Sequence, residues 1–454
     1  CDIGDIEVQV SASIGVTLYP QDEQDADTLL RHADQAMYKA KDLGRNGYQI
    51  FDAEHDKQSR SRLQSLQRLA LALEEGELQL YYQPKVNMRD GQIVGMEALM
   101  RWHHPQRGVL PPGAFLPDVE DTHLDTRLGE WVIATALQQM AAWRGEGRVL
   151  SVSVNISAHH LQQPDFVERL AELLEAHPDV PRGMLEIEVL ESTALSDIDH
   201  VSRLIQTCQA LGVRFSLDDF GTGYSSLLYL KRLPADKLKI DQSFVRSMLE
   251  SSDDLAIVQG IIGLSEAFSR ELVAEGVETI ELGNLLLHLG CDVAQGYGIA
   301  KPMPADEVVS WCQHWQSPPA WRQTARKRWT QDDIFLFGLE LNLGAQLDRL
   351  FAMAQGGEAR GGWDDDLGER FLRWYGTDGL MRYGAHPDYA LLGQLQSELQ
   401  QMSLQMWQAL CLQDEEAVQQ QLPSLLRLRQ QHSQAVRNLL SGMPQLQANG
   451  ADVS

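Results

Sequence analysis

Short apolar runs and amphipathic stretches alternate over the middle of the chain. The runs are rich in β-branched residues and have the length of strands, whereas the stretches carry apolar residues three or four positions apart, as helices do. The eight candidate strands are LQLYYQ (78–83), IVGMEAL (93–99), VLSVSVN (149–155), LEIEVLE (185–191), RFSLDD (214–219), KLKID (237–241), ELVAE (271–275) and DVAQ (292–295). Helical patterns such as EWVIATALQQMAAW, VSRLIQTCQALG and DLAIVQGIIGLSEAF lie between several of them. This order predicts an α/β fold, a TIM-like (β/α)₈ barrel.

The turn NMRDGQ joins the first two candidate strands. An Asp-Gly pair between two apolar runs is a strong short-range signal for a hairpin. We therefore expect one strand of the barrel to run antiparallel to its neighbours.

Two further regions flank the barrel. Residues 1–55 contain VQVSASIGVTLY, TLLRHADQAMYKAKDLG and YQIF, which read in order as a strand, a helix and a strand. The barrel is expected over 60–316, because SPP at 317–319 marks a break. Beyond it, amphipathic stretches such as QLQSELQQMSLQMWQALC predict an all-helical domain over 325–445.

The charge balance restricts the kind of partner. The formal net charge of −26 argues against a binder of DNA or RNA polymers or of anionic membranes, because both need basic surface. One small anionic substrate stays compatible, since bound divalent cations can reverse the local sign. No stretch has the roughly 18 uninterrupted apolar residues that a membrane span requires.

Cysteine usage suggests a reducing compartment. The five cysteines are scattered and form no CxxC pair, so we expect free thiols and a cytoplasmic location. Because the first residue is Cys1 and not a methionine, we expect a fragment or a processed product. Segments upstream of Cys1 could then include a membrane anchor or a sensor.

Polar residues end nearly every candidate barrel strand. The carboxyl ends of barrel strands are where this fold builds its active sites. A single polar strand end can simply be solvated, but seven consecutive strands with the same feature make that interpretation improbable for the set. The residues are Glu97, Asn155, Glu188, Asp218 with Asp219, Lys239, Glu275 and Gln295.

These side chains suggest a particular metal. Carboxylate and amide oxygens are hard donors suited to Mg²⁺, Mn²⁺ or Ca²⁺, and without a cluster of His or Cys zinc is not expected. Asp218 and Asp219 would face opposite sides of a regular strand, but a turn at the strand end lets both reach the mouth. One of them could bridge two ions, which would clamp the attacking and leaving oxygens of a phosphodiester displacement. Lys239 could then orient the attacking water. A turn or helix cap at DDFGTG is the alternative reading of the Asp pair.

Several ordered motifs resemble those of the EAL-domain cyclic-di-GMP phosphodiesterases. EALMR at 97–101 resembles the signature of that family, and the later motifs follow in its order and spacing over roughly residues 60–315. They are VNIS, LEIEVLES, DDFGTGYSSLLYL, KIDQSFV, VAEGVE and QGYGIAKP. The resemblance implies a barrel that hydrolyses cyclic-di-GMP to linear pGpG with two Mg²⁺ or Mn²⁺ ions.

The same resemblance implies roles for individual residues. Ligands of the first metal would be Glu97, Asn155, Glu188 and Asp218, and those around the second would be Asp218, Asp219 and Glu275. Lys239, Glu275, Glu97 and Gln295 form the implied catalytic set, with Lys239 on the attacking water. Substrate contacts would be Gln83, Arg101, Asp241 and Tyr297, and Glu278 would anchor the DDFGTGYSS loop. Leu190 stands where the family commonly has Thr, and we expect that change to tune activity without abolishing it.

The flanking regions carry further resemblances. SASIGVTLYP and ADQAMYKAKDLGRNGYQIFD resemble the last part of a GGDEF diguanylate cyclase domain, whose signature loop is absent from this sequence. ERFLRWYGTDGLMRYGAHPDY faintly resembles a CZB zinc-binding sensor domain, but Glu369 stands at the position of the cysteine ligand. A helical bundle without metal, used for sensing or for assembly, is therefore preferred, with His386 and His432 as ordinary histidines.

The prediction from sequence is thus a metal-dependent phosphodiesterase that works as a homodimer. The alternative is a receptor that binds cyclic-di-GMP without hydrolysing it. Such receptors usually lose a metal ligand or the water-orienting residue, and this chain keeps all of them. What the helical domain senses, and whether the complete protein makes cyclic-di-GMP, stay open.

Overall fold

The structure is a computed structural model that describes residues 2–3, 6–7, 11–22, 25–191, 197–223, 227–355 and 366–440. The chain divides into two compact units, Cys1–Leu78 with Trp102–Glu120, and Gln79–Arg101 with Asp121–Ser454. Each unit is described by itself below.

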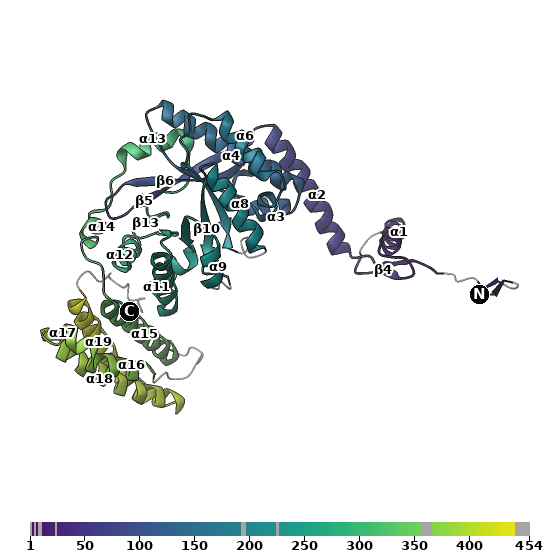
Figure 1. Ribbon diagram of the computed structural model, residues 1–454. Helices are drawn as coiled ribbons and strands as arrows, with labels where there is room; N and C mark the ends of the chain where they lie inside the picture. The colour runs from purple at the N-terminus through teal and green to yellow at the C-terminus, as the bar shows by residue number, and fades with distance from the viewer. Residues whose placement is uncertain are drawn as a thin grey trace. The chain divides into compact units, whose positions relative to one another are not determined.

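Eight strands of the described chain close into the predicted barrel (Figure 1). Around the barrel the order is β5, β13, β12, β11, β10, β9, β8 and β6, and β6 pairs with β5 again. The bounds are β5 Leu78–Asn87, β6 Ile93–His104, β8 Val152–Asn155, β9 Leu185–Leu190, β10 Arg214–Phe220, β11 Lys237–Ile240, β12 Glu271–Ala274 and β13 Val293–Ala294. Strands β6 and β8 to β13 pair in parallel, whereas β5 is antiparallel to β13. The expected barrel and its antiparallel first strand are therefore confirmed.

The strands alternate strictly between two environments. On β11, Leu238 and Ile240 alternate with Lys237 and Lys239, and all four side chains are buried. Because successive side chains on a strand point to opposite faces, the apolar pair packs outward under the helices while the lysines enter the barrel. The barrel therefore has a charged interior inside an apolar shell.

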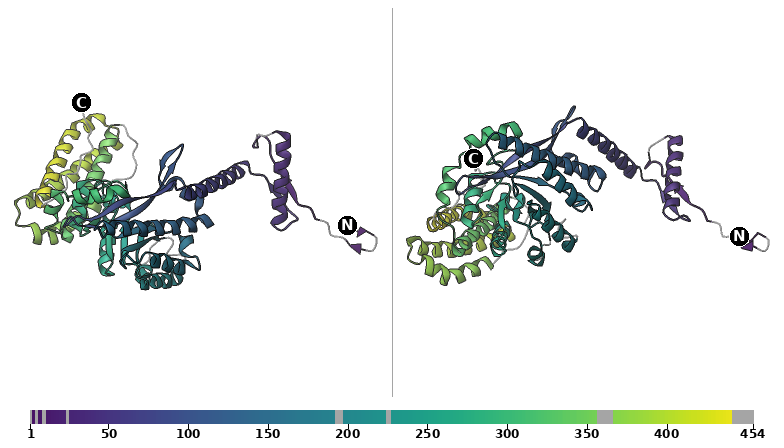
Figure 2. Two further views of the ribbon diagram at one scale, coloured as in Figure 1. Left: turned by 90° about the horizontal axis from the view of Figure 1, so that it is seen from above. Right: turned by 45° about the horizontal axis from the view of Figure 1, so that its top comes forward.

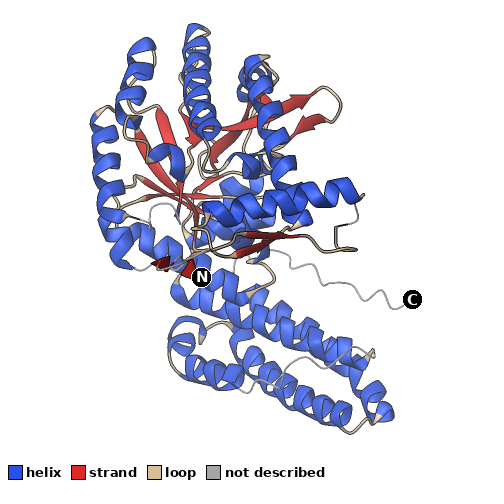
Figure 3. Ribbon diagram, turned by 90° about the vertical axis from the view of Figure 1, so that its right-hand side faces the viewer, coloured by secondary structure: helices blue, strands red, loops and turns tan. Residues whose placement is uncertain are grey.

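Helices cover the outside of the barrel, as Figure 3 shows by colour. Their bounds are α4 His123–Gly145, α5 Ala158–Leu161, α6 Phe166–Ala176, α8 Ile198–Ala210, α9 Leu227–Arg232, α10 Gln242–Ser247, α11 Ser252–Ala267, α12 Ile280–Leu289, α13 Ala305–His314 and α14 Pro319–Thr324. The short strand β14 Met303–Pro304 pairs antiparallel with β5. Side-chain caps start several of these helices: Thr279 accepts from the N–H of Leu282, and Ser251 accepts from that of Asp254.

The C-terminal region is all helical, as the sequence predicts. Its helices gather into one bundle, green to yellow in Figure 2, with bounds α15 Gln331–Ala354, α16 Asp366–Gly376, α17 Asp378–Tyr383, α18 Pro387–Cys411 and α19 Glu415–Leu439. A capping box between Thr330 and Asp333 fixes the start of α15. Just before α15, the ring of Trp329 stacks on His288 of α12 at 4.4 Å, and within α15 Asn342 accepts a 2.5 Å hydrogen bond from Ser252 of α11.

The other unit contains the first segment of the chain. Its elements are β1 Asp2–Ile3, β2 Ile6–Glu7, β3 Ile14–Val16, α1 Ala26–Asp42, β4 Tyr48–Ile50, α2 Ala53–Glu74, β7 Gly108–Leu110, η1 Pro112–Ala114 and α3 Leu116–Val119. Strands β3 and β4 are parallel, and α1 packs against both. Gly15 permits this close packing, since a Cβ there would lie 1.9 Å from the carbonyl oxygen of Ala33. The predicted strand–helix–strand order is present.

None of the described helices combines the length and the apolar character needed to cross a bilayer.

Candidate functional site

The strand-end residues singled out in the sequence converge inside one mouth of the barrel. Glu97 comes from β6, Glu188 from β9, Asp218 from β10, Lys239 from β11, and Glu275 follows β12. Lys239 lies at their centre. Its Nζ is 2.6 Å from Glu188 Oε2, 2.6 Å from Glu275 Oε1, 3.0 Å from Asp218 Oδ1 and 3.6 Å from Glu97 Oε2. One ammonium thus occupies the middle of four carboxylates, and its side chain is 1% exposed.

The acid cluster, which consists of Glu97, Glu188, Asp218 and Glu275 around Lys239, carries an excess of negative charge. Burial, and next the negative charge of Glu188, raises the pKa of Glu97. Burial likewise raises the pKa of Glu275, against the opposing effect of Lys239. Burial alone would lower the pKa of Lys239, but the surrounding carboxylates, Asp218 first, hold that pKa well above its ordinary value. Four carboxylates around one ammonium leave an excess that protons or added cations must compensate.

The adjacent aspartates reach the mouth together because β10 is irregular at its end. The pairing register of β10 with β11 shifts between Leu217 and Phe220, and Asp219 has a left-handed backbone with φ +54°. The N–H of Asp219 donates to Asp218 Oδ1 at 3.0 Å. A carboxylate oxygen from each of Asp218, Asp219 and Glu275 lies within 4.8 Å of the others. These hard oxygens could hold a metal ion, as the donor chemistry predicts.

Two amides orient Glu97. Asn155 Nδ2 donates to Glu97 Oε1 at 2.8 Å, and Gln295 Nε2 donates to Glu97 Oε2 at 2.5 Å. Gln295 also reaches Gln83 at 3.0 Å, and Gln83 in turn donates to the carbonyl of Ala300 at 2.9 Å. The buried Oε1 of Gln295 has no hydrogen-bond partner among the described residues. A buried acceptor of this kind fits a site that takes up an ion or an ordered water.

The residues expected to contact substrate surround the same mouth. Asp241 follows β11, caps α10 by accepting from the N–H of Ser243 at 2.9 Å, and lies against Asp219. Arg101 lies on β6 with its guanidinium 5.7 Å from the ring centre of Tyr81. Tyr297 is 55% exposed, which leaves its ring accessible.

The loop after β10 has a contact that the sequence analysis missed. Glu191, directly after β9, is 5% exposed and accepts from the N–H of Gly221 through Oε2 at 3.1 Å. Glu278, which the sequence predicts to anchor the loop, forms an ion pair at 2.6 Å with Arg246 of α10. Residues 224–226 of the loop lie outside the described residues. An acidic residue three positions after Glu188 at a strand end was the available signal for Glu191.

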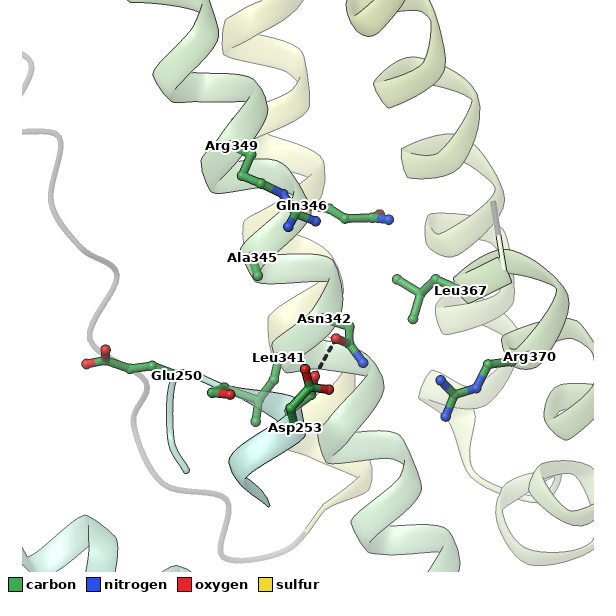
Figure 4. Close-up of a pocket in the computed structure, with 11 residues that line it drawn as sticks. Glu250, Asp253, Leu341, Asn342, Ala345, Gln346, Arg349, Leu367 and Arg370 are labelled. Carbon is green, nitrogen blue, oxygen red and sulfur yellow. Dashed lines mark hydrogen bonds between the residues drawn. The ribbon is translucent and has the colours of Figure 1, made fainter. Parts of the chain in front are cut away.

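A separate cavity lies between the barrel and the helical bundle. It has a volume of about 400 Å³, and the acid cluster does not contribute to its lining. Glu250 and Asp253 from the barrel side and Asn342, Arg349 and Arg370 from the bundle line it, and Figure 4 shows Asp253 next to Asn342. It is therefore distinct from the strand-end site, to which the chemistry above belongs.

The closed barrel, its antiparallel first strand and its acidic mouth place the chain among the (β/α)₈ barrels. The sequence profile of the EAL domain matches residues 66–302, and that of the GGDEF domain of diguanylate cyclases matches residues 1–47. The chain belongs to the EAL domain family. The resemblances to the EAL and GGDEF domains are thereby confirmed.

Known relatives support this assignment. The chain is 45% identical over 305 residues to the bifunctional diguanylate cyclase/cyclic di-GMP phosphodiesterase MucR of Pseudomonas aeruginosa, covering 67% of this chain and 44% of MucR. It is 38% identical over 309 residues to the cyclic di-GMP phosphodiesterase PdeR of Escherichia coli, covering 68% and 46%. The chain thus spans less than half the length of these relatives. A solved structure, the PaMucR phosphodiesterase in complex with c-di-GMP, is 44% identical with a TM-score of 0.52, covering 54% of this chain and 99% of that one.

Proposed function

We propose that the barrel hydrolyses cyclic-di-GMP to linear pGpG and needs two divalent cations, Mg²⁺ or Mn²⁺, to do so. The observation that carries this proposal is the acid cluster around Lys239. An ammonium already occupies the place where four carboxylates converge. The site is therefore built for positive charge, and its donors are the hard oxygens that these cations prefer.

The position of each residue suggests its role in metal binding or in catalysis. Glu97, Asn155, Glu188 and Asp218 would hold the first ion, and Asp218, Asp219 and Glu275 the second. Bound ions would supply the charge that activates water and stabilises the leaving oxygen. With cations taking over part of the carboxylate contacts of Lys239, its N–H groups would be available to orient the attacking water. Gln295 keeps Glu97 in place through its 2.5 Å hydrogen bond.

The outer residues hold the dinucleotide. Arg101 is placed to bind a phosphate, because a guanidinium presents paired donors to phosphate oxygens. Gln83, Asp241 and Tyr297 line the same mouth and would contact the rest of the ligand. Glu191, through Gly221, and Glu278 would steady the loop that follows Asp219.

A turnover assay tests this proposal and separates it from the receptor alternative. Purified protein with cyclic-di-GMP and Mn²⁺ should release pGpG, detected by liquid chromatography. Chelation by EDTA should stop the reaction, and Glu97→Ala should abolish it. Binding of cyclic-di-GMP without any product would instead support the receptor.

We further propose that the protein is a cytoplasmic homodimer. The family resemblance supports the dimer. The four described cysteines, Cys208, Cys291, Cys312 and Cys411, are free, which fits a reducing compartment. Sedimentation in the analytical ultracentrifuge would test the dimer, and a monomer at micromolar concentration would contradict it.

A further inference from the structure

A second layer of polar and charged side chains lies inside the barrel, two residues before the site residues of β8, β9 and β11. Ser153, Glu186 and Lys237 precede Asn155, Glu188 and Lys239 by two positions, so they face the same interior. The exposed fractions are 1% for Ser153, 3% for Glu186, 4% for Lys237 and 2% for Lys85, which joins the layer from β5. The motifs quoted in the sequence analysis give these residues no role.

Lys85 is held by three acceptors. Its Nζ is 2.8 Å from Ser153 Oγ, 3.2 Å from Glu188 Oε1 and 3.4 Å from Glu186 Oε1. An ammonium has three N–H donors, and each of them finds a partner here. Lys85 is therefore fixed in one place beneath the acid cluster.

The two carboxylate oxygens of Glu188 each contact a different lysine. Oε1 faces Lys85 in the deeper layer, and Oε2 lies 2.6 Å from Lys239 in the cluster. The terminal torsion of a glutamate is intrinsically broad, so a carboxylate with no partner on one oxygen can rotate. Ser153 also hydrogen-bonds to Glu188, and the charge-assisted bond from Lys85 adds the stronger restraint that directs Oε2 toward the mouth.

We propose that Lys85 is a positioning residue for cation binding: by holding Oε1 of Glu188 it keeps Oε2 aimed at the place where the first divalent ion binds. This inference rests on the proposed function. It assigns Lys85 to the support of a ligand and not to the chemistry, because Lys85 meets the cluster through Oε1 of Glu188, on the side away from the mouth.

Two effects of removing Lys85 oppose each other, and this makes the inference testable. Loss of a buried positive charge would by itself favour a nearby cation. Loss of the hydrogen bond would let the carboxylate of Glu188 rotate, and this would weaken cation binding. We expect the second effect to dominate, because partners that orient a metal ligand typically change metal affinity by about 10–100-fold.

The test compares Lys85→Met with a matched control, Lys237→Met. Lys237 lies in the same layer and contacts Glu186 at 2.5 Å and Glu271 at 3.6 Å, and no contact with Glu188 is found for it within the described residues. Both variants lose one buried ammonium, but only the first loses the bond to Glu188. Calorimetric titration with Mn²⁺, without substrate, measures the binding directly.

We expect Lys85→Met to bind Mn²⁺ about 10–100-fold more weakly and Lys237→Met to bind close to wild type. Hydrolysis by Lys85→Met should recover at high Mn²⁺, with the half-saturating concentration shifted and kcat little changed. Wild-type affinity or tighter binding in Lys85→Met would overturn the inference, as would equal weakening in both variants.

Two further measurements keep the result unambiguous. If Lys85→Met does not fold, the double variant Lys85→Met/Glu186→Gln replaces it, because it keeps the net charge of the layer. This double variant should still bind Mn²⁺ weakly. Wild-type binding by it would also overturn the inference. Failure of the proposed function would differ from both outcomes, because the wild-type protein itself would then bind no Mn²⁺ and release no pGpG.

Discussion

His160 gives the barrel a pH-dependent stability whose size follows from its surroundings. It lies on α5 with 2% exposure, its ring centre is 5.0 Å from that of Phe166, and its Nδ1 has no hydrogen-bond partner among the described residues. Gly129 packs directly against the ring, since a Cβ there would lie 2.0 Å from Nδ1. Burial lowers the pKa of His160 from 6.5 to about 4, although Glu130 and Asp165 act in the opposite direction.

The sign and the size of the effect follow from linkage. A histidine whose folded pKa lies below its unfolded value stabilises the fold above the unfolded pKa, and this stability is lost as the pH falls from 6.5 toward 4. Near pH 5 the unfolded chain binds a proton at this position that the folded chain does not. The free energy of unfolding should fall by about 2 kcal/mol between pH 7.5 and pH 5 on this account.

Urea unfolding at the two pH values measures this difference. His160→Gln should be less stable at pH 7.5 but should lose about 2 kcal/mol less than wild type on going to pH 5. The raised carboxylate pKa values of the acid cluster are common to both proteins and cancel in the comparison. His200→Gln, at an exposed position, is the control and should behave as wild type. Equal losses in wild type and His160→Gln would refute the reasoning.

Three other perturbations test the site and the domain boundary. Glu191→Ala removes a charge-assisted hydrogen bond to the loop, worth about 1.5–3 kcal/mol, so kcat/KM should fall roughly 10–100-fold while the melting temperature of the barrel changes little; an unchanged kcat/KM would show that the contact is dispensable. Lys239→Ala should slow turnover by about 10²–10⁴-fold but leave cyclic-di-GMP binding in place, and a folded variant that no longer binds the dinucleotide in a titration would contradict the assigned role. Truncation after Thr324 removes the bundle, which is not needed to close the barrel, so hydrolysis should remain measurable while self-association weakens. An insoluble truncation would place the boundary elsewhere, and an unchanged dimer in the ultracentrifuge would remove the assembly role.

The fold was predictable because its pattern is local. Each barrel strand shows an apolar run with a polar end, and the Asp-Gly turn before β6 marks the antiparallel pair. The strand-end residues were predictable for the same reason, since parallel strands carry their carboxyl ends to one mouth. In the folded barrel, Glu97, Glu188 and Glu275 accordingly converge on Lys239.

The deeper layer was not predictable from the same pattern. Lys237 and Glu186 lie within strands, where a charged residue ordinarily indicates a solvent-facing position, because burying an isolated charge is costly. Only the closed barrel shows that Glu186 lies 2.5 Å from Lys237 and that both are buried. Glu191 was missed because its partner is a backbone N–H, so its place at a strand end, three positions after Glu188, was the one signal in the sequence.

The helical domain shows the same limit. Its helices follow from their apolar spacing, but the environment of its histidines does not. His432 Nδ1 lies 2.8 Å from Glu340 Oε2 inside the bundle, and His386 caps α18 by accepting from the N–H of Asp388 at 3.2 Å. In the part of the chain that the structure describes, Asp218, Asp219 and Glu275 form the one group of three or more His, Cys, Asp or Glu side chains that could hold a metal ion.

The most direct test of the central claim is the fate of cyclic-di-GMP when the protein is mixed with it in the presence and absence of divalent cations. The account predicts that Mg²⁺ or Mn²⁺ supports conversion to pGpG, that EDTA stops the reaction, and that adding back the cation restores it. Intact cyclic-di-GMP in every mixture, or equal conversion with and without chelator, would contradict it.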